Sequence, residues 1–166
     1  MKRGFTGETL SSFLSVTPTQ NKNYTIAIVA LYPKNQTINL HGEIKLSDGQ
    51  TTTISINMGT GNGCWQVFTG NIDLNAIVNS QVVEYLKIDI PKEISLPTAL
   101  AVLIPAGAEF EAISTDSMDR IFCKLNQFME LERYIYDGKG HVSAVFDSQG
   151  NIINYYQRNE NNNNIQ

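Results

Sequence analysis

The chain has 166 residues, 42% of them hydrophobic and 17% charged, with a formal net charge of −4 at pH 7 and a pI near 5.1. The acidic balance, with Lys and Arg scattered singly, predicts no nucleic-acid binding. No stretch approaches the roughly 18 apolar residues of a membrane span, and the N-terminal segment lacks the continuous apolar run of a signal peptide. The length and apolar content predict one domain with a real core plus an appendage.

Residues 1–23 are predicted to form an N-terminal arm. Leu10, Phe13 and Leu14 have helical spacing, but Pro18 ends any helix there. Two interpretations stay open: the arm packs on its own domain, or it docks on a neighbouring subunit.

Residues 24–113 have the pattern of a β-sandwich domain. Tyr24–Tyr32 is a β-branched apolar run typical of a strand buried on both faces, and Thr98–Ile104 reads as a second core strand. About seven short strands separated by turn signals predict an antiparallel sandwich or a jelly roll. The other predicted elements are a hairpin at Thr37–Met58, strands at Cys64–Thr69, Val82–Ile90 and Phe110–Ile113, and a helical turn or two at Asp73–Asn79.

The hairpin also predicts a register. Apolar residues alternate with polar ones on both sides of the turn at Ser47–Gln50, and opposite residues of an antiparallel pair share a face. We therefore expect Ile44 opposite Ile54 and Leu46 opposite Thr52. Such pairing requires a loop with an odd number of residues or a bulge, rather than a two-residue Asp-Gly turn.

A composition shift at Ser114 opens the third segment, residues 114–166. From Asp116 to about Arg133 the apolar residues form one helical stripe, which predicts an amphipathic helix with Asp116 as N-cap and Asp119 in its first turn. The helix either packs on the sandwich or bundles with copies of itself. The stripe consists of Met118, Ile121, Phe122, Leu125, Phe128 and Met129.

A β-ribbon is predicted to follow the helix. Tyr134–Tyr136, His141–Phe146 and Ile152–Tyr156 alternate with Asp-x-x-Gly turns that begin ten residues apart. This stretch of 23 residues resembles one unit of the YD (RHS-type) repeats of large secreted and wall-associated bacterial proteins. We carry no function over from that resemblance. The polar tail, residues 159–166, is expected to be disordered in a free monomer.

The motifs of common catalytic sites are missing. Gly59–Gly63 has neither the spacing of a dinucleotide fingerprint nor the Gly-Lys-Ser/Thr of a P-loop, so we expect a flexible inter-strand loop. A dyad of Cys64 with His41 stays open, although both Cys64 and Cys123 are expected to be buried free thiols. The His and Cys residues show no metal-ligand spacing, and no cofactor is predicted.

The aromatic residues allow two interpretations. An open face of rings would suit a sugar-binding module, whereas Tyr and Trp are also favoured at protein interfaces. We favour the interface because no set of polar companions accompanies the rings. The candidate interface residues are Phe5, Leu10, Phe13, Leu14, Trp65, Phe128, Tyr134, Tyr136, Tyr155 and Tyr156.

The sequence thus predicts a mainly β protein: an antiparallel sandwich or jelly-roll body with one C-terminal amphipathic helix and a β-ribbon. The predicted function is not enzymatic. We expect a structural subunit of an assembly, a homo-oligomer that docks through its terminal extensions, as in a small decoration, fibre-attachment or adaptor protein of a tailed-phage virion. The alternatives are a carbohydrate- or small-ligand-binding β-module and a small host-directed effector or inhibitor. Its location would be the virion, or otherwise the cytoplasm.

Overall fold

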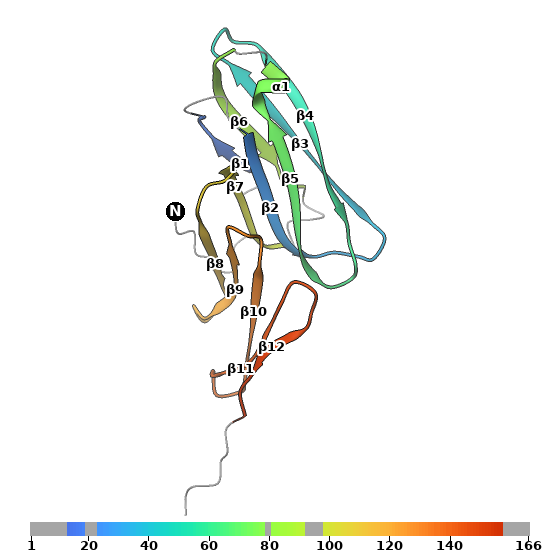
Figure 1. Cartoon of the computed structure of the whole chain (residues 1–166), viewed down its shortest axis with the longest axis vertical. Helices are drawn as coiled ribbons and strands as arrows, with labels where there is room; N and C mark the ends of the chain where they lie inside the picture. The colour runs from blue at the N-terminus through green and yellow to red at the C-terminus, as the bar shows by residue number, and fades with distance from the viewer. Residues whose placement is uncertain (1–12, 19–22, 79–80, 92–97, 158–166) are drawn as a thin grey trace, which may run out of the picture.

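The computed structural model describes residues 13–18, 23–78, 81–91 and 98–157. This part of the chain is mainly β, with three antiparallel sheets of four, five and three strands, one short helix and no closed barrel (Figure 1). The elements are β1 (Phe13–Val16), β2 (Asn23–Leu31), β3 (Thr37–Leu46), β4 (Thr51–Thr60), β5 (Trp65–Asp73), α1 (Leu74–Val78), β6 (Val83–Asp89), β7 (Thr98–Pro105), β8 (Glu111–Thr115), β9 (Ile121–Asn126), β10 (Leu131–Tyr136), β11 (Val142–Phe146) and β12 (Ile152–Tyr155).

Two of the sheets enclose the main core. Sheet A has the strand order β1-β6-β3-β4, and sheet B has the order β5-β2-β7. Their alternating apolar residues meet between the sheets, where Ile28, Leu40 and Phe68 are at most 2% exposed. The edges also approach one another, because β4 lies beside β5 and β1 lies beside β7. We call these two sheets the body.

Sheet B is covered on its second face as well. Ala27 and Val29 of β2 pack against Cys123, Leu125 and Leu131, which belong to sheet C. Sheet C has the order β12-β11-β10-β9-β8 and continues beyond the body toward the C-terminal end of the molecule (Figure 1). The predicted strand at residues 24–32 is present as β2 and is buried on both faces up to Ala30, whereas Leu31 is exposed and Tyr32 follows the strand.

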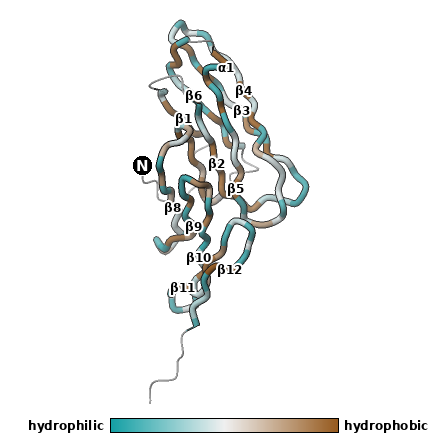
Figure 2. Tube along the Cα trace, in the orientation of Figure 1, coloured by the Kyte–Doolittle hydropathy of each residue, from teal (hydrophilic) through white to brown (hydrophobic). Residues whose placement is uncertain are grey.

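Hydropathy follows this arrangement. Figure 2 shows hydrophobic residues along the strands of the body and hydrophilic residues at its turns.

The predicted helical turn is present as α1, where Asp73 Oδ1 accepts the backbone N–H of Ala76 at 3.1 Å, as an N-cap does.

The register of the β3–β4 hairpin is shifted by two residues from the prediction. Ile44 lies opposite Thr52, not Ile54, and Leu46 is joined to Gln50 by a 2.8 Å hydrogen bond from its N–H to the Gln50 carbonyl. The loop is nevertheless of odd length, as predicted, because three residues remain between Leu46 and Gln50. Gly49, at φ 88°, supplies the left-handed residue that closes a loop of this kind.

The prediction of a helix over 116–133 is wrong. These residues form a turn, strand β9, a second turn and the start of β10. Met118 and Phe128, which completed the helical stripe, are 71% and 72% exposed at the two turns. The strand form places Cys123 and Leu125 on sheet B, where they are fully buried.

The borders of the predicted segments also shift. Residues 13–16 of the predicted arm form β1, which pairs antiparallel with β6 as the edge strand of sheet A. Of residues 110–113, expected to end the sandwich, Glu111 to Ile113 belong instead to β8 of sheet C. The arm before Phe13 and the tail from 158 onward lie outside the described residues.

Candidate functional site

The five strands of sheet C are joined by four turns of the same type. Asp116, Asn126, Asp137 and Asp147 each begin a turn, and each side-chain Oδ1 accepts two backbone N–H groups, from the residues two and four positions further on, at 2.8–3.1 Å. The backbone N–H of each first residue also donates to the carbonyl of the residue four positions on. The same local chemistry therefore reverses the chain four times.

The fourth position of every turn is left-handed. It is occupied by Asp119 (φ 58°), Met129 (φ 60°), Gly140 (φ 84°) and Gly150 (φ 83°). Only the last two carry the glycine that makes such a turn visible in a sequence, which is why the first two turns were missed. An Asp or Asn every ten or eleven residues, from 116 to 147, is the signal that remains.

The carboxylates of these turns are stabilised in their charged form. The side-chain hydrogen bond from Arg120 lowers the pKa of Asp116, and the ion pair between them measures 2.6 Å. The backbone N–H of His141 and the Asn151 side chain lower the pKa of Asp137 and of Asp147, respectively. His141 Nδ1 lies 3.4 Å from Asp137 Oδ2, which is within reach for an ion pair when the imidazole is protonated.

Cations lie over aromatic rings across sheet C. Arg120 is 4.4 Å from the ring centroid of Tyr136, and Arg133 is 4.8 Å from that of Phe146. Tyr136 O–H donates to the Ile121 carbonyl at 2.8 Å, and burial raises its pKa. Tyr134 is held likewise: burial and its hydrogen bond to Glu132 raise its pKa. Both tyrosines are thus fixed within the sheet.

The last strand of sheet C is different, because its side chains are exposed. Ile152, Ile153, Tyr155 and Tyr156 are 57%, 46%, 64% and 54% exposed. We call these four residues the β12 patch. Strand β12 pairs with β11 on one side only, so its other side is an open sheet edge within the described part of the chain. Open apolar edges of this kind are ready templates for another strand.

The candidate interface residues separate into three groups. Phe13 (43% exposed), Phe128, Tyr155 and Tyr156 lie at the surface. Leu14, Trp65, Tyr134 and Tyr136 are half-buried: Leu14 packs on the main core, and Trp65 packs edge-on against Phe122 with ring centroids 5.2 Å apart. Phe5 and Leu10 lie outside the described residues.

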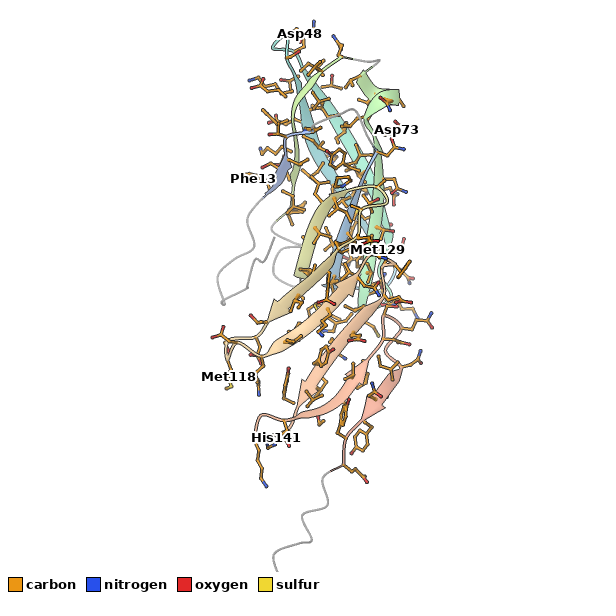
Figure 3. All side chains as sticks on the ribbon, turned by 60° about the vertical axis from the view of Figure 1, so that its left-hand side comes forward. Phe13, Asp48, Asp73, Met118, Met129 and His141 are labelled. Carbon is orange, nitrogen blue, oxygen red and sulfur yellow. The ribbon has the colours of Figure 1, made fainter. Side chains whose placement is uncertain are left out.

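These surface residues do not form one site. Figure 3 shows Phe13 on the flank of the body, whereas Met118 and His141 mark two separate turns of sheet C, below the body in that view. The sequence-based set missed Ile152 and Ile153 of the β12 patch. Nothing in their local pattern shows that their strand is the last of its sheet.

A second surface feature is a depression of about 370 Å³ on the outer face of sheet A. It is lined by His41, Glu43, Thr53, Ser55 and Asp89, together with Gly42 and Ile54. Asp89, His41 and Ser55 lie directly opposite one another on β6, β3 and β4. Among the hydrogen bonds of the described residues none joins these three side chains, whereas Tyr85 O–H donates to Glu43 at 2.8 Å nearby.

The cysteines are free but not alike. Cys123 is buried 3.1 Å from the Ser114 hydroxyl, and burial raises the pKa of its thiol. Cys64 is exposed, so the prediction that it is buried is wrong. Nor does the structure bring Cys64 to His41, because Cys64 lies beyond the Thr37–Thr60 end of the hairpin, whereas His41 pairs with Ser55. Among the described residues no cluster of His, Cys, Asp and Glu could hold a metal ion.

The glycine loop is tightly fitted to its neighbours. A Cβ on Gly61 would lie 2.3 Å from the Pro33 carbonyl oxygen, and the N–H of Gly63 donates to the Tyr32 carbonyl at 3.1 Å. Gly61 therefore serves close backbone approach between strands, whereas Gly59 and Gly63 supply left-handed backbone at φ 102° and 86°.

Comparison with protein-family models, with curated proteins and with solved structures finds no match to this chain. Within the described ranges, no helix is long and apolar enough to cross a membrane.

Proposed function

We propose that this protein is a non-enzymatic assembly or adaptor subunit that binds other protein subunits through the C-terminal end of sheet C. The observation that carries the proposal is the β12 patch, four large apolar side chains exposed around an open sheet edge. Monomeric proteins cover or charge such edges, because an exposed row of backbone N–H and C=O groups pairs with other chains. Here the stretch from Ile152 to Gln157 contains no charged residue.

We also propose that the body, with its two facing sheets and shared core, is of the β-sandwich type, either a plain sandwich or a jelly roll. The narrower prediction of a tailed-phage particle is supported by the sequence composition alone.

The test is the mass of the purified full chain in solution, measured by light scattering over a range of concentrations. We expect a mass above the 18.5 kDa of one chain. Combining Ile152→Thr with Tyr155→Thr keeps residues suited to a strand while removing apolar surface, and we expect it to lower the mass. The control is Thr53→Ser, at an exposed position of β4. A monomer at every concentration, unaffected by the β12 substitutions, would contradict the proposal.

A second candidate function is supported by the depression on sheet A. Its imidazole, carboxylate and hydroxyl groups suit a small polar ligand such as a sugar. Trp65 does not contribute an exposed platform to such a site, because it packs against Phe122. Titration of the full chain with a panel of sugars, followed by the backbone amide NMR signals of Thr53 and Ser55, which line the depression, tests this candidate. His41→Gln should weaken the sugar-induced shifts of these two signals, and the absence of shifts with every sugar in the wild type would exclude the candidate for those sugars.

A further inference from the structure

The β12 edge differs from the other edges of the three described sheets, which lie close beside a strand of another sheet. Strand β4 lies beside β5, and both β1 and β8 lie beside β7. Among the described edge strands, β12 is the one without a close approach of this kind. The partner that completes this edge must therefore come from outside the described chain.

The backbone of β12 shows which groups are open to that partner. Tyr156 N–H donates inward to the Ser143 carbonyl at 2.9 Å. Since successive residues of an antiparallel strand point their N–H and C=O groups to opposite sides, those of Tyr155 point to the open side. Ile153 falls at the bulge in the β11–β12 pairing and has no partner residue on β11.

The side chains of this segment are self-complementary. Residues 152–156 read Ile-Ile-Asn-Tyr-Tyr, so an antiparallel copy centred on Asn154 places Ile153 opposite Tyr155 and Ile152 opposite Tyr156. Aliphatic β-branched residues then meet aromatic ones at all four positions, and the two amides meet at the centre. No like charges are opposed, because the segment has none.

We propose that the partner at the β12 edge is a second copy of this chain, paired antiparallel through β12 about a two-fold axis at Asn154. This rests on the proposed assembly function and names its partner. The two copies of sheet C would become one continuous sheet across the axis, with the same residues contributed by each chain. The backbone direction of Tyr155 agrees with this pairing: its N–H and C=O face the open side, as a hydrogen-bonded pair with Ile153 of the second copy requires, and Asn154 then faces Asn154 in a non-hydrogen-bonded pair.

The sharpest test is a cysteine at the axis. Opposite Cα atoms of a non-hydrogen-bonded pair are about 4.5 Å apart, which lies within the range that a disulfide spans. Asn154→Cys in a Cys64→Ser background should therefore give disulfide-linked dimers on a non-reducing gel of the purified full chain, while the buried Cys123 stays reduced. The matched control is Gln149→Cys, an exposed turn position outside the pairing, which should stay monomeric on the gel.

Two further variants test the register and the backbone. Tyr155→Pro removes an N–H that points to the open side, so it should reduce the mass from two chains to one while the circular dichroism stays unchanged. Ile153→Lys with Tyr155→Lys should also give monomers, because like charges face each other. Ile153→Glu with Tyr155→Lys should restore the dimer, because each Glu then faces a Lys of the second copy.

The outcomes separate this inference from the proposed function. A dimer with the cysteine cross-link and the charge rescue supports the two-fold pairing. An oligomer that forms without the cross-link, or that tolerates Tyr155→Pro, overturns the pairing and leaves the assembly proposal standing. A monomer under all conditions overturns both.

Discussion

Sheets A and B bury Ile28, Leu40 and Phe68 between them, whereas sheet C ends on a strand whose four residues are all exposed. Apart from the β3–β4 hairpin, residues that pair within the body are far apart in the sequence, such as Tyr24 with Pro105, but those that pair in sheet C are near neighbours joined by short turns. The body is thus stabilised mainly by long-range apolar burial and the outer part of sheet C by local turn chemistry. The four predictions below test this difference.

The largest effect is expected from Phe68→Ala. Phe68 is 2% exposed and makes an edge contact with the Tyr32 ring at 6.1 Å between centroids. Truncating a buried Phe costs about 3–5 kcal/mol, from lost transfer free energy and the cavity left behind. Urea unfolding of the full chain measures this cost. Phe128→Ala is the matched control, because Phe128 is 72% exposed and should change the free energy of unfolding by no more than about 0.5 kcal/mol. Similar losses for both would mean that the two regions do not differ in packing.

Gly70→Ala tests how closely the two sheets of the body approach. A Cβ at Gly70 would lie 2.4 Å from Ile56 Cγ2 and 2.7 Å from Met58 Sδ, both on the facing sheet. Overpacking of this kind costs about 1–3 kcal/mol in the free energy of unfolding. At Gly138, in a turn of sheet C, a Cβ meets nothing within 4 Å. Gly138→Ala should therefore be neutral or stabilise by up to about 1 kcal/mol, and a loss there as large as at Gly70 would contradict the contrast.

The same contrast explains which parts of the fold could be predicted. The apolar run at Tyr24–Tyr32 shows directly that its strand is covered twice, and the parity of the β3–β4 loop follows from alternation alone. The helix over 116–133 was predicted because Met118 and Phe128, at turn tips, completed a helical stripe. A pattern of apolar residues cannot distinguish a residue that faces the core from one exposed at a turn.

The candidate interface residues likewise include some that the sequence could identify as exposed and some that it could not. Phe128, Tyr155 and Tyr156 stand out as large rings in polar surroundings, and they are exposed in the structure. Trp65 looks the same in sequence, yet it packs on Phe122, which is far along the chain and was assigned to a helix. The β12 edge could not be predicted at all, since being the last strand of a sheet is a property of the topology.

The left-handed turn position gives the third prediction. Gly150 has φ 83° and open space around its Cα, so Gly150→Ala changes only the backbone strain, at a cost of about 1–2 kcal/mol. Asp119 is exposed and holds the equivalent position of its turn at φ 58°, so Asp119→Gly should stabilise the protein. The gain should be smaller than the loss caused by Gly150→Ala, because Asp tolerates the left-handed conformation better than Ala does. Thermal unfolding of both variants measures the two changes. Equal signs would show that the four turns are not equivalent.

The smallest effect is a pH dependence of the turns. Hydrogen bonds to Asp137 and Asp147 lower their pKa values below the unfolded value, so at moderately acidic pH the unfolded chain binds more protons than the folded one. The stabilisation is complete above the unfolded pKa, about 4, and is lost as the pH falls through the lower folded pKa values. Asn126 already holds the first position of an equivalent turn as a neutral amide, so Asp137→Asn with Asp147→Asn should keep the turns but lack this titration. Denaturant unfolding between neutral and acid pH should therefore show a steeper loss of stability for the wild type, with the two curves converging at low pH. Parallel curves would mean that the turn carboxylates contribute through geometry alone, as Asn126 does.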